Sequence, residues 1–211
     1  MKKLFWSLLI VLLSLINARG QRTWFEFEVA KSLGEKFEIA LAPQIRFKEE
    51  LKLHEYFFEP KIEYDFNKYF ALGANYRVGN NPDKDGKAQW YGRYTLDAKT
   101  GYDWKNFETQ FRLRYTNFDD FGGDESNASN YLRFRLQLEY NIEKIDMKPY
   151  ISYELYRNLV QGVYERARWE SGLEYKFNKH HRVGVYFRLN DYLASNDESL
   201  KIIGISYKFK L

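Results

Sequence analysis

The chain of 211 residues lacks cysteine and is poor in proline, and both shortages narrow what it can be. Without cysteine it has no disulfide, no lipid-modified N-terminal cysteine and no thiolate for a metal. Its four prolines suit hydrogen-bonded strands, because proline has no N–H to donate to a sheet. The sequence also contains no phosphate-binding loop, dinucleotide fingerprint or HExxH motif. After residue 20, no stretch approaches the roughly 18 consecutive apolar residues of a membrane-spanning helix.

Residues 1–20 have the pattern of an export signal. Two lysines near the start precede an apolar stretch at residues 4–16, which is too short to cross a membrane as a retained anchor helix. Small residues, Ala18 and Gly20, stand at the −3 and −1 positions and predict cleavage before Gln21. Removing this segment takes three positive charges from a formal net charge of +4 and leaves +1. A nearly neutral mature chain gives no support for a nucleic-acid partner.

What the mature chain has in abundance is aromatic residues placed at every second position. Aromatic residues make up 19 % of the sequence and hydrophobic residues 45 %, yet the mean hydropathy is −0.62. The last five residues, Tyr-Lys-Phe-Lys-Leu, show the pattern, with lysines filling the gaps between apolar residues. Because a strand turns successive side chains to opposite faces, such a segment has one apolar and one charged face.

This two-residue period recurs in eleven segments. It is clearest at residues 131–140, where Leu132, Phe134 and Leu136 alternate with Arg133 and Arg135. The predicted strands are residues 24–31, 37–48, 53–66, 69–78, 89–104, 107–116, 131–140, 147–156, 165–177, 182–193 and 200–211.

Short and long polar connections alternate along the chain from residue 66 onward. Outer-membrane β-barrels have this asymmetry, with short periplasmic turns and longer extracellular loops. We therefore predict an all-β fold: a transmembrane antiparallel up-and-down barrel of ten to twelve strands, formed by residues 21–211 as one domain. Single-chain bacterial barrels have even strand counts. Either residues 24–31 lie outside a ten-stranded wall, or one segment contains two strands.

The tryptophans support a spanning arrangement. Trp90 and Trp104 share a face and lie 14 positions apart, which is about 46 Å along a strand. With a tilt near 45° the height is roughly 33 Å, slightly more than an apolar band of about 25 Å. We expect Trp90, Trp104 and Trp169 to be girdle residues at the membrane interfaces. The alternative is that they are core tryptophans of a soluble sandwich, which a predicted strand of this length disfavours.

The segment Tyr131 to Ile142, followed by Lys148-Pro149-Tyr150-Ile151-Ser152-Tyr153-Glu154-Leu155, resembles an uncharacterised family of Gram-negative outer-membrane barrels, known only as a domain of unknown function. Further matching pieces are Trp24, Arg46-Phe47, Tyr76-Arg77, the segment Phe111 to Tyr115 and Gly172-Leu173-Glu174-Tyr175. The resemblance covers nearly all of the mature chain. It implies the fold and the location, and it transfers no catalytic residue.

The polar faces of these strands carry many charges of both signs. In a barrel of about ten strands they face an interior only slightly wider than side chains can fill. Paired charges would plug the barrel, whereas gaps between them would leave a narrow pore whose basic bias favours anions. The lumen-facing candidates are Arg46, Arg77, Arg93, Arg112, Arg114, Arg133, Arg135, Glu154, Arg168, Glu170 and Arg188.

Signals for chemistry are weak. A lipid-modifying enzyme needs a histidine beside a hydroxyl at the rim, and His54 is the only candidate histidine for that place. The loop with Asn81, Asp83 and Asp85 resembles the first half of a calcium loop, but its twelfth position is Gly92 rather than glutamate. We therefore name no catalytic residue and no cofactor.

The sequence predicts a monomer in the cell outer membrane, with a structural or surface-interaction role and a charge-filled lumen. A narrow, weakly anion-favouring solute pore is the alternative, and a lipid-modifying enzyme is the third possibility. The expected partners are outer-membrane lipids and the barrel-assembly machinery, which would bind the C-terminal strand.

Overall fold

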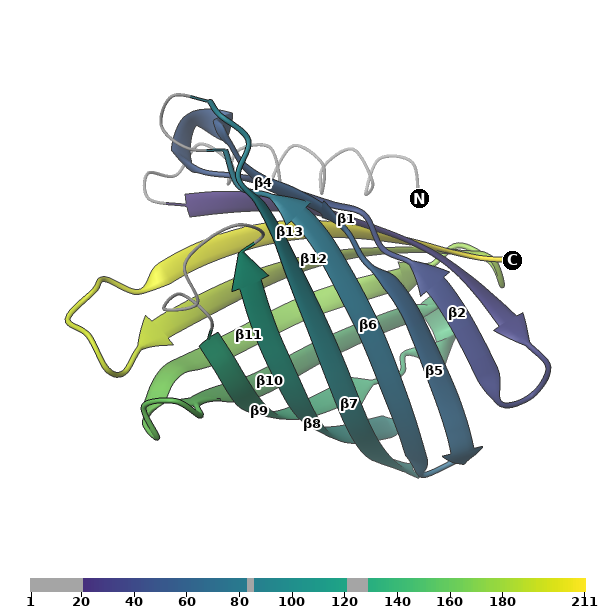
Figure 1. The fold of residues 1–211 in the computed structure, drawn as a ribbon. Helices are drawn as coiled ribbons and strands as arrows, with labels where there is room; N and C mark the ends of the chain where they lie inside the picture. Colours follow the sequence, from purple (N-terminus) through teal and green to yellow (C-terminus); the bar gives the residue numbers. More distant parts are fainter. Residues whose placement is uncertain (1–20, 83–85, 121–128) are drawn as a thin grey trace.

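The computed structural model describes residues 21–82, 86–120 and 129–211, and the predicted export signal lies outside them. Strands make up most of this part of the chain (Figure 1). Their bounds are β1 (Gln21–Leu33), β2 (Phe37–Leu41), β3 (Gln44–Phe47), β4 (Leu53–Phe58), β5 (Pro60–Asn67), β6 (Phe70–Asn80), β7 (Trp90–Trp104), β8 (Phe107–Asp120), β9 (Ser129–Tyr140), β10 (Met147–Asn158), β11 (Tyr164–Lys176), β12 (His181–Tyr192) and β13 (Leu200–Lys210). Two short 3-10 helices, η1 (Glu49–Leu51) and η3 (Glu143–Ile145), lie in connections. No helix of these described ranges is long and apolar enough to cross a membrane.

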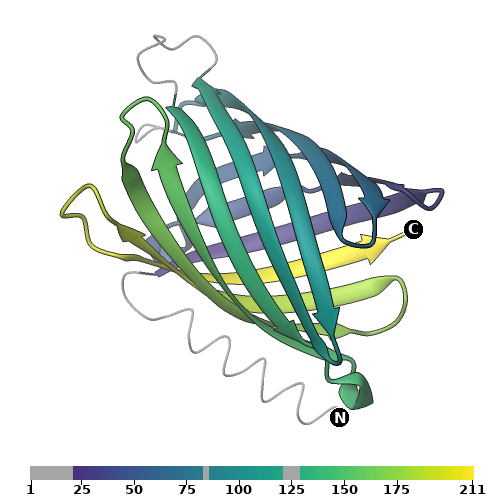
Figure 2. The same cartoon turned by 90° about the horizontal axis from the view of Figure 1, so that it is seen from below.

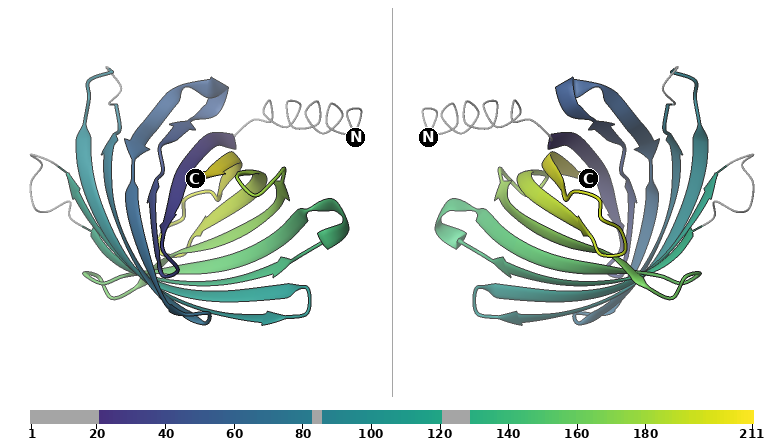
Figure 3. Two further views of the ribbon diagram at one scale, coloured as in Figure 1. Left: turned by 90° about the vertical axis from the view of Figure 1, so that its right-hand side faces the viewer. Right: turned by 90° about the vertical axis from the view of Figure 1, so that its left-hand side faces the viewer.

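The strands form one closed sheet of thirteen segments. Because β2 leads into β3 and β4 into β5, the described chain crosses the barrel eleven times. This number lies within the predicted ten to twelve, and the N-terminal segment is part of the wall. The strands tilt steeply as they curve around a common axis (Figure 3).

An odd number of crossings makes the first and last strands parallel. β1 pairs with β13 in parallel from Gln21 opposite Lys201 to Ala30 opposite Lys210, and the two strands lie side by side in Figure 2. Every other strand pairing is antiparallel. The predicted antiparallel pairing is therefore interrupted only at this seam of the described sheet, and the eleven crossings depart from the even counts of single-chain bacterial barrels.

Two irregularities break the second and third crossings without opening the wall. Residues 42–43 separate β2 from β3, and Glu59 separates β4 from β5. The Phe27 N–H donates to the Pro43 carbonyl at 2.9 Å, and the Ala42 N–H donates to the Glu59 carbonyl at 2.9 Å. The hydrogen-bond ladder therefore continues past Pro43, which has no N–H to donate.

Side chains alternate between the two faces of the wall as the sequence predicts. On β10, Ser152, Glu154 and Tyr156 are at most 6 % exposed, whereas Ile151, the residue before Ser152, is 49 % exposed. The exposed residues of the other strands are also mostly apolar or aromatic, for example Leu136 at 61 % and Leu96 at 53 %. The polar face is thus turned inward and the apolar face outward.

The connections at the two ends of the barrel differ in length. Turns of two or three residues join β1 to β2, β5 to β6 and β7 to β8 at one end, which we call the turn end. Longer connections, such as residues 81–89 and 193–199, lie at the opposite loop end. The predicted asymmetry holds for most described connections, and the exception is the six-residue connection 141–146 at the turn end, which contains η3. Because β1 and β13 are parallel, Gln21 lies at the loop end and Lys210 at the turn end.

Three tyrosines on the inner wall lie against glycines of the neighbouring strand. Tyr91 faces Gly79, Tyr150 faces Gly172 and Tyr186 faces Gly204, each directly opposite in register. A Cβ atom added to any of these glycines would overlap the tyrosine ring. The hydroxyl of each tyrosine then reaches a glutamate, namely Glu55, Glu170 and Glu26 in that order. The missing side chain thus provides the space in which a large inward ring can lie flat.

These tyrosine–glycine pairs predict that replacing glycine by alanine lowers stability at some positions and not at others. Gly204→Ala should lower the free energy of unfolding by about 1 to 3 kcal/mol, because Tyr186 must leave its place or the strands must separate. Denaturant unfolding of the refolded barrel in detergent measures this. Gly73→Ala is the matched control, since its nearest neighbouring atom would be 3.5 Å away. Equal stability of both variants would contradict the packing described.

Candidate functional site

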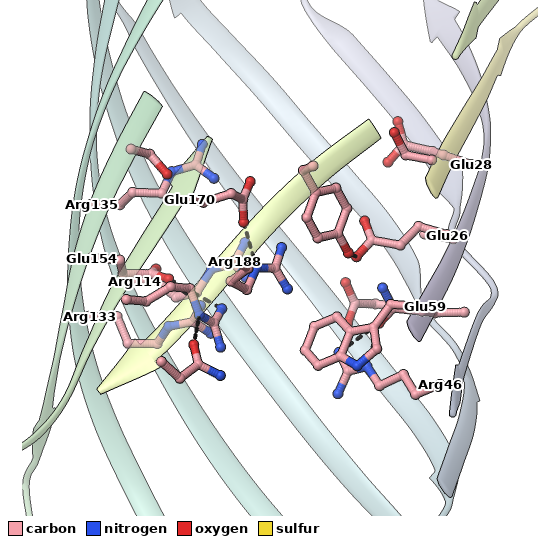
Figure 4. Close-up of a pocket in the computed structure, with 18 of the residues that line it drawn as sticks. Glu26, Glu28, Arg46, Glu59, Arg114, Arg133, Arg135, Glu154, Glu170 and Arg188 are labelled. Atoms are coloured by element: carbon pink, nitrogen blue, oxygen red, sulfur yellow. Dashed lines mark hydrogen bonds and ion pairs between the residues drawn. The ribbon is translucent and has the colours of Figure 1, made fainter. Parts of the chain in front are cut away.

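The barrel interior contains a cavity of about 630 Å³ lined mostly by charged side chains (Figure 4). All eleven lumen candidates predicted from the sequence line it: Arg46, Arg77, Arg93, Arg112, Arg114, Arg133, Arg135, Glu154, Arg168, Glu170 and Arg188. They come from β3 and from every strand between β6 and β12. Strand periodicity alone was therefore enough to predict that these residues share the barrel interior.

Positive charge exceeds negative charge around this cavity. Twelve arginines and two lysines line it, against six glutamates. Two further carboxylates, Glu55 and Asp97, pair with lining arginines from just outside this set. Counting both still leaves an excess of six positive charges among the described residues.

Glu154 on β10 is the most heavily engaged carboxylate. It is 2 % exposed and accepts from Arg112 at 2.7 Å and from Arg133 at 2.9 Å. Arg168 approaches the same carboxylate at 3.5 Å. One negative charge therefore holds three positive charges drawn from β8, β9 and β11.

Four other arginines each form an ion pair with one carboxylate. Arg114 binds Asp97 through two parallel hydrogen bonds of 2.6 Å, which is the strong bidentate geometry. The remaining pairs are Arg188 with Glu170 at 2.5 Å, Arg77 with Glu59 at 2.7 Å and Arg46 with Glu55 at 2.5 Å. The predicted network of ion pairs is present, and it coexists with the open space of the cavity.

Lysines join the ion-pair network toward the turn end. Lys208 pairs with Glu28 at 2.7 Å, and Lys61 binds the same glutamate at 2.9 Å. Lys210 binds Glu38 at 2.7 Å. These contacts connect β13 with β1, β2 and β5 and so hold the parallel seam from inside the barrel.

Several arginine guanidinium groups also lie over aromatic rings, and the sequence did not predict these contacts. The guanidinium of Arg46 lies 3.8 Å from the Trp24 ring centre, and that of Arg77 lies 3.5 Å from the Phe57 ring centre. Around Tyr156, Arg133 approaches to 4.3 Å. A cation over a ring face is attracted by the ring quadrupole, which partly offsets its removal from water.

The signal that could have revealed these residues is strand parity. Trp24 lies two positions before Glu26, and Arg166 lies two before Arg168, so each shares the inward face of its neighbour. Arg166 and Arg22 both line the cavity, although neither was among the predicted lumen residues.

The three predicted girdle tryptophans face outward. Trp90 is 47 % exposed, Trp104 58 % and Trp169 47 %. Trp24 is the opposite case, since it is 6 % exposed and packs with Tyr186 and Ile202 inside the barrel. The position of the girdle relative to a membrane stays a prediction.

The weaker chemical candidates find little support in the described residues. The His54 ring lies 3.0 Å from the Arg22 guanidinium, and no hydrogen bond from it to a serine or threonine is found in the described chain. Asp83 and Asp85 of the suggested calcium loop lie outside the described residues. Within the described ranges, no three histidine or acidic residues gather where they could hold a metal.

A closed sheet with apolar side chains outside and paired charges inside defines a β-barrel of the outer-membrane type. The chain belongs to the family described as "Protein of unknown function (DUF2490)", which matches residues 21–199. This confirms the family resemblance noted from the sequence. No curated protein matches the chain.

Among solved structures, the barrel is similar to OmpTdeltaL8, a loop L8 deletion mutant of OmpT, an outer membrane protein of Vibrio cholerae. The two chains are 15 % identical with a TM-score of 0.45, and the match covers 84 % of this chain. It spans 60 % of the length of that structure.

The contacts of Glu154 predict that this residue stabilises the barrel strongly. Glu154→Gln should lower the free energy of unfolding by about 3 kcal/mol, because three inward arginines then lose their shared counter-charge. Glu50→Gln is the control, since Glu50 on η1 and its partner Lys52, which follows η1, are both exposed and surface pairs contribute little. Denaturant unfolding in detergent compares the two variants. A Glu154→Gln barrel as stable as the control would show that the network does not support the fold.

Proposed function

We propose that this chain is an outer-membrane barrel whose lumen is a narrow passage for small anions. The membrane location is supported by the outer wall, where apolar and aromatic side chains are exposed on strand after strand. Exposed apolar area of this extent around a whole molecule marks a surface that needs a nonaqueous environment. A closed sheet also suits a bilayer, because its backbone N–H and C=O groups are paired within the wall.

The excess of arginine around the cavity is the observation on which the anion preference rests. Rings of Arg and Lys favour anions in pores, because they replace part of the hydration lost by the ion. The cavity extends from Arg22 and Arg166 near the loop end to Arg182 and Lys208 near the turn end. A second cavity of about 210 Å³ lies at the turn end, where five carboxylates and the two lysines Lys68 and Lys99 line it, so the anion preference rests on the larger cavity alone. Together the two cavities follow most of the barrel length.

The ion-pair network favours a second function, a wall-spanning structural or surface-interaction protein with a closed lumen. Glu154 and Glu170 hold arginines of nearby strands against the inner wall, so a solute must pass beside these contacts or displace them. The two functions differ in one property, since the passage conducts ions and the closed barrel does not.

Two proposals about partners follow from the same surfaces. We propose that lipids contact the outer wall, and that the assembly machinery binds the strand that ends the barrel. The outward residues Tyr207 and Phe209 of β13 lie beside β1, the strand with which β13 pairs to close the sheet. A single closed sheet needs no second copy, which agrees with a monomer.

Planar-bilayer recording tests the passage directly. In a salt gradient, the reconstituted barrel should carry a small current whose reversal potential indicates anion preference. Arg166→Glu should shift that potential toward cations, because Arg166 lines the cavity near the loop end. Lys201→Glu makes the same charge change on the exposed side of β13 and should leave the potential unchanged. No current above background would refute the passage and leave the structural function.

A further inference from the structure

Four arginines form a compact block on two neighbouring strands of the inner wall. Arg112 on β8 lies directly opposite Arg135 on β9, and Arg114 lies directly opposite Arg133. Cross-strand neighbours have Cβ atoms about 5 Å apart, and residues two positions apart along a strand are separated by about 7 Å. We call Arg112, Arg114, Arg133 and Arg135 the arginine block.

Like charges directly opposite each other destabilise a sheet. The arginine block contains two such pairs side by side. The same two strands also place Glu108 opposite Glu139, but Lys148 of β10 supplies a positive charge to both of these glutamates. An arrangement that costs stability in the empty protein indicates a site that an anion completes.

The protein supplies too few counter-charges to the arginine block. Asp97 is engaged by Arg114, and Glu154 is shared by Arg112 and Arg133 with Arg168. Arg135 donates to the neutral Gln110 side chain at 3.1 Å, and no carboxylate of the described residues forms an ion pair with it. Counting Arg168 with the block, five positive charges face two negative ones.

The guanidinium groups also have unused donors. The Nε atoms of Arg112, Arg133 and Arg135 are buried and have no hydrogen-bond partner within the described chain. A buried N–H without an acceptor is costly, and an arginine fork can turn to present that edge to a bound oxygen. Figure 4 shows Arg114, Arg133 and Arg135 on the same side of the cavity.

We propose that the arginine block binds a doubly charged tetrahedral oxyanion of the phosphate type. Guanidinium groups match phosphate oxygens bidentately, whereas chloride offers no such directional acceptors. Two negative charges fit the local excess better than one. The block faces the cavity rather than the outer wall, so the ligand is free phosphate rather than a lipid headgroup. This inference rests on the proposed anion passage and names the anion that it would retain.

Isothermal titration of the refolded mature barrel with inorganic phosphate tests the site. Wild-type protein should show saturable binding of one phosphate. Arg135→Gln should weaken it about tenfold or more, since it removes a charge-assisted bond. Arg182→Gln is the matched control: it removes one positive charge from the inner wall near the turn end, at a partly exposed pair with Glu174. Phosphate affinity of this control should stay within about twofold of wild type, because a partly exposed pair is well screened.

Thermal unfolding separates loss of binding from loss of folding. Without phosphate, Arg135→Gln should unfold at or above the wild-type temperature, because the substitution removes a like-charge contact. The rise in unfolding temperature that phosphate causes in wild type should disappear in this variant. Absence of saturable phosphate binding in wild type, or equal binding by Arg135→Gln, would overturn the proposal. Equal binding of phosphate and chloride would overturn it as well.

This outcome is distinguishable from failure of the passage. A barrel that carries an anion current but binds no phosphate would refute the site and leave the passage. A barrel that binds phosphate at the arginine block without conducting would support the site as a binding site and refute the passage.

Discussion

The parallel ladder between β1 and β13 is the contact on which the remainder of the molecule depends. It pairs ten residues of the first strand with ten of the last and leaves the described sheet without an open edge. An open edge in a bilayer would expose unpaired backbone groups to hydrocarbon, where each costs several kcal/mol. Once the sheet is closed, each strand has an inside and an outside, and the two-residue period of the sequence assigns every side chain to one of them.

Closure also determines how the charges behave. Inward arginines are held near one another although their charges repel. Their positions are therefore set by the strand register rather than by the interaction between the side chains. Glu154 and the aromatic rings of Trp24, Phe57 and Tyr156 offset much of this repulsion. Part of what they do not offset lies at the arginine block. The proposed function and the proposed ligand are therefore two consequences of one excess of positive charge.

Much of the fold could be predicted from the sequence because strand periodicity is a local property. The eleven predicted segments correspond to the eleven crossings, and all predicted lumen residues line the cavity. The parallel seam could not be predicted, since it depends on the pairing of residues about 180 positions apart. The register that places Arg112 opposite Arg135 could not be predicted either, since it too depends on how separate strands pair. Trp24 was not named as a lumen residue, because aromatic side chains in a barrel are expected on the lipid face.

The orientation of alternate side chains is the central claim, and the absence of cysteine makes it directly measurable. Single cysteines at positions 134 to 139 of β9, spin-labelled in reconstituted vesicles, report contact with oxygen dissolved in lipid or with a water-soluble nickel complex. Labels at 134, 136 and 138 should respond to oxygen, and those at 135, 137 and 139 to nickel. Responses without this two-residue alternation, or nickel contact at 136 and 138, would contradict the account.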